Sequence, residues 1–253
     1  MGEQPYAVKS VGTTFQIVHT LNQHGQMGVT AIANETGFTK GTVYKHLKTL
    51  HSLGYVTTTA GRYELSLRFL GVGTRTQRRN LLFQRSRAAI DNLSSIVQTT
   101  ANLMIKEQDI GVYLYRVGET ALIEENAPAI GEPVPLHATA GGKAILSQLP
   151  RETVDSIIES TGLAQFTEKT ITTPEILYEE LRTIRDRKLA YERAEHLSSV
   201  QCVAAPINTP NGPVGAVTIS GSTDQMSGKT LEEDFAGLVT SAAKEIELAV
   251  LKE

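Results

Sequence analysis

The sequence predicts an α+β fold in two parts: three helices with a β-hairpin, then a larger α/β unit with a mostly antiparallel sheet. Residues 11–52 space their apolar side chains at helical intervals, whereas residues 55–65 alternate with a period of two. From residue 101 onward, short strand-like runs alternate with helical runs. A helical linker is expected between the two parts.

The distribution of charged residues also separates an N-terminal part of the chain from the rest. Residues 1–88 hold 11 Lys and Arg against three acidic residues, while the rest of the chain holds 13 basic and 24 acidic residues. The net charge of -3 therefore hides a basic N-terminal third on an acidic body. This asymmetry indicates that the first part meets a polyanion and that the second part does not.

The first unit is predicted to contain a helix-turn-helix. A helix over residues 11–23 is followed by a short helix that ends at Gly37, where glycine supplies a left-handed turn. Thr39 is expected to cap the third helix, in which Val43, Leu47 and Leu50 repeat at i, i+4 and i+7. That spacing packs one side of the third helix inward and leaves a small, polar and basic side outward.

The stretch YVTTTAGRYEL predicts a hairpin that turns at Ala60 and Gly61, with Arg62 beside its tip. Helix, turn, helix and hairpin together favour a winged helix-turn-helix domain over residues 5–65. Residues 66–87 contain six arginines and no acidic residue. They favour a linker helix over residues 66–88, broken at Gly71 and Gly73.

The remaining residues, 89–253, are expected to form the α/β domain. The strand-like runs lie at residues 101–107, 111–117, 120–125, 200–207 and 212–221. The helical runs lie at residues 89–98, 141–149, 153–160, 174–188 and 231–251. Short strands with helices between them favour a sheet with helices on its faces.

The outward side of the third helix is the candidate DNA-reading surface. The major groove of double-stranded DNA admits one helix, whose first residues can reach base edges while a wing and a linker hold phosphates. A single basic helix is more often only a solvated surface, but the turn, the wing and the local charge favour DNA binding. The predicted DNA-binding residues are Thr39, Lys40, Gly41, Thr42 and Lys45 at the helix start, with Lys48 and Arg62 placed for phosphates.

Signals for catalysis, metals and membranes are weak. The one cysteine, Cys202, excludes an intramolecular disulfide, and it has no His, Asp or Glu partner at a spacing typical of metal ligands. We therefore expect no catalytic residue, no metal and no cofactor. An alternative stays open, in which Cys202 acts with His137 in a hydrolase-like enzyme fused to the DNA-binding module. No run of eighteen apolar residues and no signal or transit pattern occurs, so we expect a cytoplasmic protein without a membrane partner.

Several segments in order resemble the IclR family of transcriptional regulators. They are VTAIANETGFTKGTVYKHLKTLHSLGYV, GRYELSLRFLGVG, PVPLHATAGGKAIL, EILYEELRTIRDRKLAYERAEHLSSVQCVAAPI and GAVTISG, and together they span nearly the whole chain. The resemblance implies a C-terminal effector-binding domain of GAF-like topology. It also implies binding to DNA as a homodimer or as a tetramer made of two dimers. Because such a dimer has two-fold symmetry, we expect an inverted-repeat operator.

The resemblance also implies a pocket for a small-molecule effector, an organic, sugar or aromatic acid, beside the GGKA helix. A helix start at 139–142 offers N–H groups to a carboxylate, and Thr218 and Ser220 share one strand face as hydroxyl donors. Alternatively, these two hydroxyls only satisfy each other within the sheet. The matching positions are Asn126, Val134, Ala140, Gly141, Glu192, Val200, Cys202, Thr218 and Ser220. The effector itself, the operator sequence and the sign of regulation do not follow from these residues.

Overall fold

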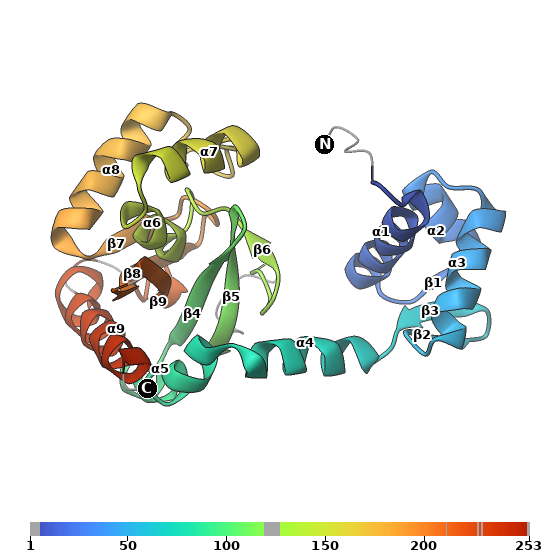
Figure 1. The fold of residues 1–253 in the computed structure, drawn as a ribbon, viewed down its shortest axis with the longest axis horizontal. Helices are drawn as coiled ribbons and strands as arrows, with labels where there is room; N and C mark the ends of the chain where they lie inside the picture. Colours follow the sequence, from blue (N-terminus) through green and yellow to red (C-terminus); the bar gives the residue numbers. More distant parts are fainter. Residues whose placement is uncertain (1–5, 119–126, 211, 227, 229, 252–253) are drawn as a thin grey trace. The chain divides into compact units, whose positions relative to one another are not determined.

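The computed structural model describes residues 6–118, 127–210, 212–226, 228 and 230–251 (Figure 1). The chain divides into two compact units between Thr76 and Gln77. The strand expected at residues 120–125, and the candidate effector residue Asn126, lie outside the described residues.

The N-terminal unit is a winged helix-turn-helix, as predicted. Its helices are α1 (Lys9–His24), α2 (Val29–Thr36) and α3 (Lys40–Ser52), and its strands are β1 (Met27–Gly28), β2 (Val56–Thr59) and β3 (Arg62–Leu65). The strands form an antiparallel sheet in the order β1-β3-β2. Ala60 and Gly61 both have positive φ, at 51° and 77°, as a two-residue hairpin turn requires.

The core of this unit comes from one side of each helix. Ile17 and Leu21 of α1, Ile32 of α2, and Val43 and Leu47 of α3 are at most 2% exposed and belong to one apolar cluster. The predicted apolar stripe of α3 therefore packs inward against the other two helices.

The predicted break in the linker helix was wrong in its position. Helix α4 (Arg68–Arg79) runs through Gly71 and Gly73, and α5 (Leu81–Val97) begins after Asn80. A glycine inside a helix costs only about 1 kcal/mol, so two of them do not have to end it. Asn80 has an extended backbone, and its side chain accepts a hydrogen bond of 3.2 Å from the N–H of Phe83. The chain therefore breaks where a capping residue starts the next helix.

The C-terminal unit contains one antiparallel sheet of six strands among the described residues. These are β4 (Thr100–Glu107), β5 (Ile110–Val117), β6 (Pro133–Val134), β7 (Ala190–Arg193), β8 (Val200–Thr209) and β9 (Gly212–Ser222), in the order β6-β5-β4-β9-β8-β7. The prediction of an antiparallel sheet is confirmed. The short strands β6 and β7 were not anticipated, because two to four residues do not establish an alternation.

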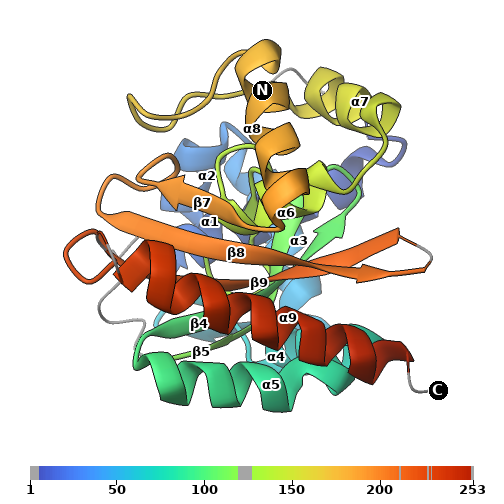
Figure 2. The ribbon, with the colours of Figure 1, turned by 90° about the vertical axis from the view of Figure 1, so that its left-hand side faces the viewer.

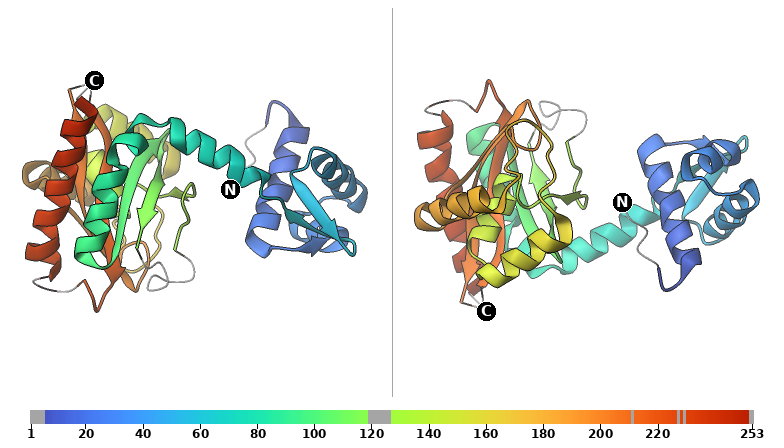
Figure 3. Two further views of the ribbon diagram at one scale, coloured as in Figure 1. Left: turned by 90° about the horizontal axis from the view of Figure 1, so that it is seen from below. Right: turned by 90° about the horizontal axis from the view of Figure 1, so that it is seen from above.

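Helices cover both faces of this sheet (Figure 2). Helices α5 and α9 (Phe235–Leu251) pack side by side on one face, and a π-helical turn, Thr230–Asp234, leads into α9 (Figure 3). The other face carries α6 (Ala140–Ser147), α7 (Arg151–Thr161) and α8 (Pro174–Arg187). Strand β9 lies between β4 and β8, so residues from distant parts of the chain meet at the centre of the sheet.

Candidate functional sites

The start of α3 is the candidate DNA-binding surface. Thr39 caps the helix, because its hydroxyl accepts a hydrogen bond of 3.2 Å from the N–H of Thr42. The hydroxyl oxygens of Thr39 and Thr42 also lie 3.0 Å apart and form a hydrogen bond with each other. Each hydroxyl therefore has fewer hydrogen bonds left to offer to DNA. Lys40, Gly41, Lys45 and Lys48 are exposed on the side of α3 away from the core. The three lysines give this side of α3 a cationic surface.

Two side chains modify this surface. Tyr44 was not among the predicted residues, yet this residue is 50% exposed and precedes Lys45 on the helix. Its place next to Val43, one step off the apolar stripe, is the sequence signal that indicates this exposure. Arg62 is exposed at the start of β3, and its guanidinium donates to the carbonyl of Gln26 at 2.5 Å. That bond holds the wing to the β1 segment and leaves only part of the guanidinium for a phosphate.

The candidate effector site is a row of polar side chains on the face of the sheet beneath α6. Cross-strand pairing places Glu192 beside Cys202, Cys202 beside Ser220, and Thr218 beside Asn102. We call Asn102, Glu192, Cys202, Thr218 and Ser220 the polar strip. Each is at most 7% exposed and lies next to the apolar cluster beneath α6. The strip joins residues that are up to 118 positions apart in sequence.

Asn102 lies at the β4 end of the strip, and sequence reasoning missed it. Its amide nitrogen donates to Thr218 Oγ1 at 2.8 Å and to Ser220 Oγ at 3.1 Å. The hydroxyls of Thr218 and Ser220 are therefore both bonded to Asn102. The alternative in which these two hydroxyls bond only to each other is not what the structure shows. Ser220 Oγ also lies 3.1 Å from Cys202 Sγ. The signal in the sequence was a lone polar residue in the otherwise apolar start of the run ANLMI.

The N-terminus of α6 rests directly on this strip. A Cβ atom at Gly141 would lie 2.9 Å from both Met104 Sδ and Thr218 Cγ2, so only glycine permits this approach. Thr139 caps the helix by accepting from the N–H of Gly142 at 3.3 Å. The N–H groups of Ala140 and Gly141 have no acceptor among the described residues. A helix start with free N–H groups favours an anion or a carbonyl oxygen.

Glu192 is a carboxyl group inside the protein, with an exposed fraction of 2%. Burial raises its pKa to about 7, although it accepts hydrogen bonds from the N–H groups of Glu195 at 2.7 Å and His196 at 3.2 Å. The pKa of the Cys202 thiol is also raised, first by burial and then by the nearby Glu192. Near neutral pH this end of the strip can therefore hold or release a proton at Glu192, while the thiol stays protonated.

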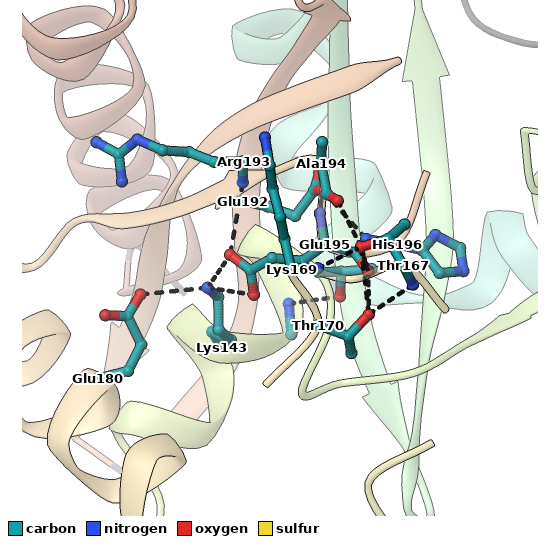
Figure 4. Close-up of polar contacts among 12 residues, drawn as sticks. Lys143, Thr167, Lys169, Thr170, Glu180, Glu192, Arg193, Ala194, Glu195 and His196 are labelled. Carbon is teal, nitrogen blue, oxygen red and sulfur yellow. Dashed lines mark hydrogen bonds and ion pairs between the residues drawn. The ribbon is translucent and has the colours of Figure 1, made fainter. Parts of the chain in front are cut away.

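Lys143 forms a buried ion pair beside the strip (Figure 4). Its ammonium group lies 2.7 Å from Glu195 Oε1 and 3.2 Å from Glu180 Oε1, and the side chain is 1% exposed. The hydroxyls of Thr167 and Thr170 hold the same loop by donating to the carbonyl of Glu195 at 3.2 and 2.6 Å. The partners of Lys143 are 37 and 52 residues away, so spacing within the GGKA motif could not reveal them.

The remaining predicted residues lie in different places. Val134 and Val200 are buried in the apolar cluster beneath α6 and α8, where they contribute packing rather than polar contacts. Cys202 lies on the strip, but His137 contacts the carbonyl of Ala164 at 3.0 Å and the ring of Phe166 instead. A thiol with a raised pKa and no contact to His137 is a poor nucleophile, so this geometry does not favour the hydrolase alternative.

None of the helices in the described part of the chain is long and apolar enough to cross a membrane. No group of three or more His, Cys, Asp or Glu side chains there is arranged to hold a metal ion.

Two family models match the chain: the bacterial transcriptional regulator IclR C-terminal domain over residues 74–248, and the IclR helix-turn-helix domain over residues 10–60. The chain is 30% identical over 247 residues to the HTH-type transcriptional regulator KdgR of Escherichia coli strain K12, which covers 96% of this chain and 94% of that protein.

Solved structures show the same likeness. The structure of Thermotoga maritima IclR matches with a TM-score of 0.79 and 26% identity, and covers 96% of this chain and 98% of that one. An IclR homolog of Microbacterium hydrocarbonoxydans, solved in complex with 4-hydroxybenzoate, matches with a TM-score of 0.80 and 17% identity, over 95% of this chain and 98% of that one. At that identity, this second likeness concerns the fold.

Proposed function

The chain belongs to the IclR family of bacterial transcriptional regulators, and we propose that its α3 reads an inverted-repeat operator while its polar strip binds a small acid that changes operator affinity. It is a DNA-binding regulator with an N-terminal helix-turn-helix domain and a C-terminal effector domain. In this proposal residues 5–65 bind DNA, residues 66–88 link the domains and residues 89–253 bind the effector. The protein acts in the cytoplasm as a homodimer or a dimer of dimers, so that two α3 helices meet two half-sites.

The DNA-binding part of the proposal rests on the exposed side of α3. Thr39, Lys40, Gly41, Thr42 and Lys45 occupy the first turns, where side chains can reach base edges. Lys48 lies one turn later, and Arg62 lies on the wing, where each can meet a phosphate. Footprinting on genomic promoter fragments tests this part. Two protected half-sites in inverted order are expected, and a single unrepeated half-site contradicts the symmetric arrangement.

One observation carries the effector part: four strands and a helix start bring hydrogen-bonding groups together inside an apolar layer. A buried polar group costs free energy unless it is partnered, and the N–H groups of Ala140 and Gly141 have no acceptor among the described residues, so this place favours a polar ligand. The proposed contacts are Asn126, Val134, Ala140, Gly141, Glu192, Val200, Cys202, Thr218 and Ser220.

A small acid fits the two ends of this site. The free N–H groups of Ala140 and Gly141 suit its carboxylate, and Glu192 suits a hydroxyl group at its other end. A thermal-shift screen of central-metabolism acids, sugar acids and aromatic acids identifies the effector. A ligand present at roughly 100 times its Kd stabilises the folded protein by about 2.7 kcal/mol.

Operator titration with and without the identified acid tests the coupling between the two sites. A typical coupling of ~1–3 kcal/mol changes operator affinity about 5–150-fold. Ser220→Ala and Glu192→Ala are expected to abolish this response and to leave ligand-free affinity within about twofold, since neither residue lies in the basic third. If both variants respond like the wild type, the effector binds elsewhere. If both lose DNA binding without ligand, these residues support the fold.

A further inference from the structure

Arg116 determines which way the amide of Asn102 faces. The Nε of Arg116 donates to Asn102 Oδ1 at 2.6 Å, and a second guanidinium nitrogen donates to the carbonyl of Pro128 at 2.7 Å. The guanidinium also lies 4.5 Å from the centre of the Tyr113 ring. Since a guanidinium carries only donors, the atom of Asn102 that faces it must be the oxygen. The NH₂ group of Asn102 must then face Thr218 and Ser220.

This orientation decides the direction of the next hydrogen bonds. Thr218 Oγ1 and Ser220 Oγ both accept from the Asn102 NH₂, so neither hydroxyl can point its proton at Asn102. Among the described residues, Thr218 Oγ1 has no acceptor for its own proton. That hydroxyl is 2% exposed and lies under the start of α6, where the N–H groups of Ala140 and Gly141 are also free. This end of the strip therefore presents donors.

Arg116 also brings a positive charge to this end of the strip. The ammonium group of Lys143, on α6, forms ion pairs with Glu195 at 2.7 Å and with Glu180 at 3.2 Å. Figure 4 shows its ammonium group between these two carboxylates. Arg116 makes no ion pair with a carboxylate among the described residues, because its partners are an amide oxygen, a carbonyl and a ring.

We propose that Arg116 is a specificity-determining residue: by orienting Asn102 it makes this end of the strip a set of donors that accepts a carboxylate and rejects a carboxamide. The proposal rests on the effector site proposed above and names the group that the site recognises. A carboxylate offers acceptors only, whereas the NH₂ of a carboxamide would face the Thr218 hydroxyl and the helix N–H groups. A site built for one hydrogen-bonding pattern rejects its mismatch strongly, because buried groups are left unpaired.

The experiment compares matched acids and amides by calorimetry on the full chain. Three pairs cover three skeletons: lactate with lactamide, gluconate with gluconamide, and 4-hydroxybenzoate with 4-hydroxybenzamide. The wild type is expected to bind at least one acid, and to bind its amide at least about tenfold more weakly. Equal affinity for acid and amide overturns the proposal. So does the absence of binding by every acid up to its solubility limit.

Two variants test the role of the arginine. Asn102→Asp keeps an acceptor toward Arg116 but turns the Thr218 and Ser220 hydroxyls around, because they must now donate to the carboxylate. It is expected to lose the acid and to bind the amide better than the acid. Arg116→Gln has both a donor and an acceptor, so it no longer fixes the amide. It is expected to reduce the acid-to-amide ratio toward one without a comparable loss of melting temperature.

Matched controls separate these effects from general ones. Arg151 lies 4.3 Å from the Tyr178 ring, outside the strip, so Arg151→Gln removes a similar arginine–tyrosine contact. Asn92 is exposed on α5, so Asn92→Asp is the control for the added negative charge. Both should keep the wild-type ratio. A wild-type ratio in Asn102→Asp and Arg116→Gln overturns the proposal, and if Asn102→Asp does not fold, Arg116→Gln decides alone. Operator binding without ligand is measured separately, so a failure of DNA recognition remains distinguishable.

Discussion

The two units of this chain place their polar side chains in opposite ways. Helix α3 presents Lys40, Lys45 and Lys48 to solvent, held by an apolar stripe on the far side of the same helix. The sheet of the C-terminal unit instead encloses Asn102, Glu192 and Lys143, each at most 2% exposed. An exposed charge adds little to stability, whereas removing the partner of a buried charged group lowers the free energy of unfolding strongly. Substitutions on the exposed side of α3 are therefore expected to cost little stability, whereas substitutions at these buried positions are expected to cost more.

Removing Lys143 is expected to have the largest effect. Lys143→Met leaves the carboxylate of Glu195 buried without its counter-charge, and breaking a buried ion pair typically costs about 3–5 kcal/mol. Urea unfolding of the full chain measures this loss. Lys244→Met is the matched control, since Lys244 pairs with Glu247 at the surface at 3.0 Å, where such pairs contribute about 0–1 kcal/mol. Equal losses in the two variants contradict the difference expected between buried and exposed charges.

A pH dependence should distinguish Glu192 from the exposed acids. Because burial raises its pKa from the ordinary 4.5 to about 7, the folded chain keeps a proton that the unfolded chain releases in that window. The contribution of Glu192 to stability therefore falls as pH rises through the window, by up to about 3 kcal/mol. Glu192→Gln removes this dependence, so its stability relative to the wild type should rise with pH. A difference that stays flat between about pH 5 and 8 contradicts a raised pKa.

Lys45 should affect DNA binding and leave stability unchanged. Lys45→Ala is expected to cost roughly 1–3 kcal/mol in operator affinity and to relax base preference, if the side chain meets a base edge. Titration of the operator and of point-mutated operators measures both effects. The unfolding free energy should stay within about 0.5 kcal/mol of the wild type, as for other exposed positions.

The smallest expected effects belong to Lys48 and Arg62. Lys48→Ala and Arg62→Ala should weaken binding to every sequence alike and lower the slope of log affinity against log salt by about one. Salt titration on specific and random duplexes measures the slope. Equal, sequence-blind losses in Lys45→Ala, Lys48→Ala and Arg62→Ala would show that α3 does not read bases with the face predicted here.

Predictability also differs between the units. The stripe of Val43, Leu47 and Leu50, the cap at Thr39 and the Ala60-Gly61 turn are local signals, and the domain they predict is present. The break of the linker was placed at the glycines, because a capping bond such as that of Asn80 depends on one side-chain geometry. Asn102, Arg116 and Lys143 gain their roles from partners far along the chain. Such pairings depend on strand register, which a single sequence does not reveal.

The position of β9 affects how the chain can fold while the ribosome synthesises it. The strand at the middle of the sheet is the last one of the sheet to be synthesised, at Gly212–Ser222, and it carries Thr218 and Ser220. Until it emerges, β4, β5 and β6 can pair among themselves and β7 can pair with β8, but these two parts of the sheet are not joined. The helix-turn-helix domain is complete more than a hundred residues earlier. Because domains generally fold as units during synthesis, a nascent chain gains its DNA-binding head long before it can respond to a metabolite.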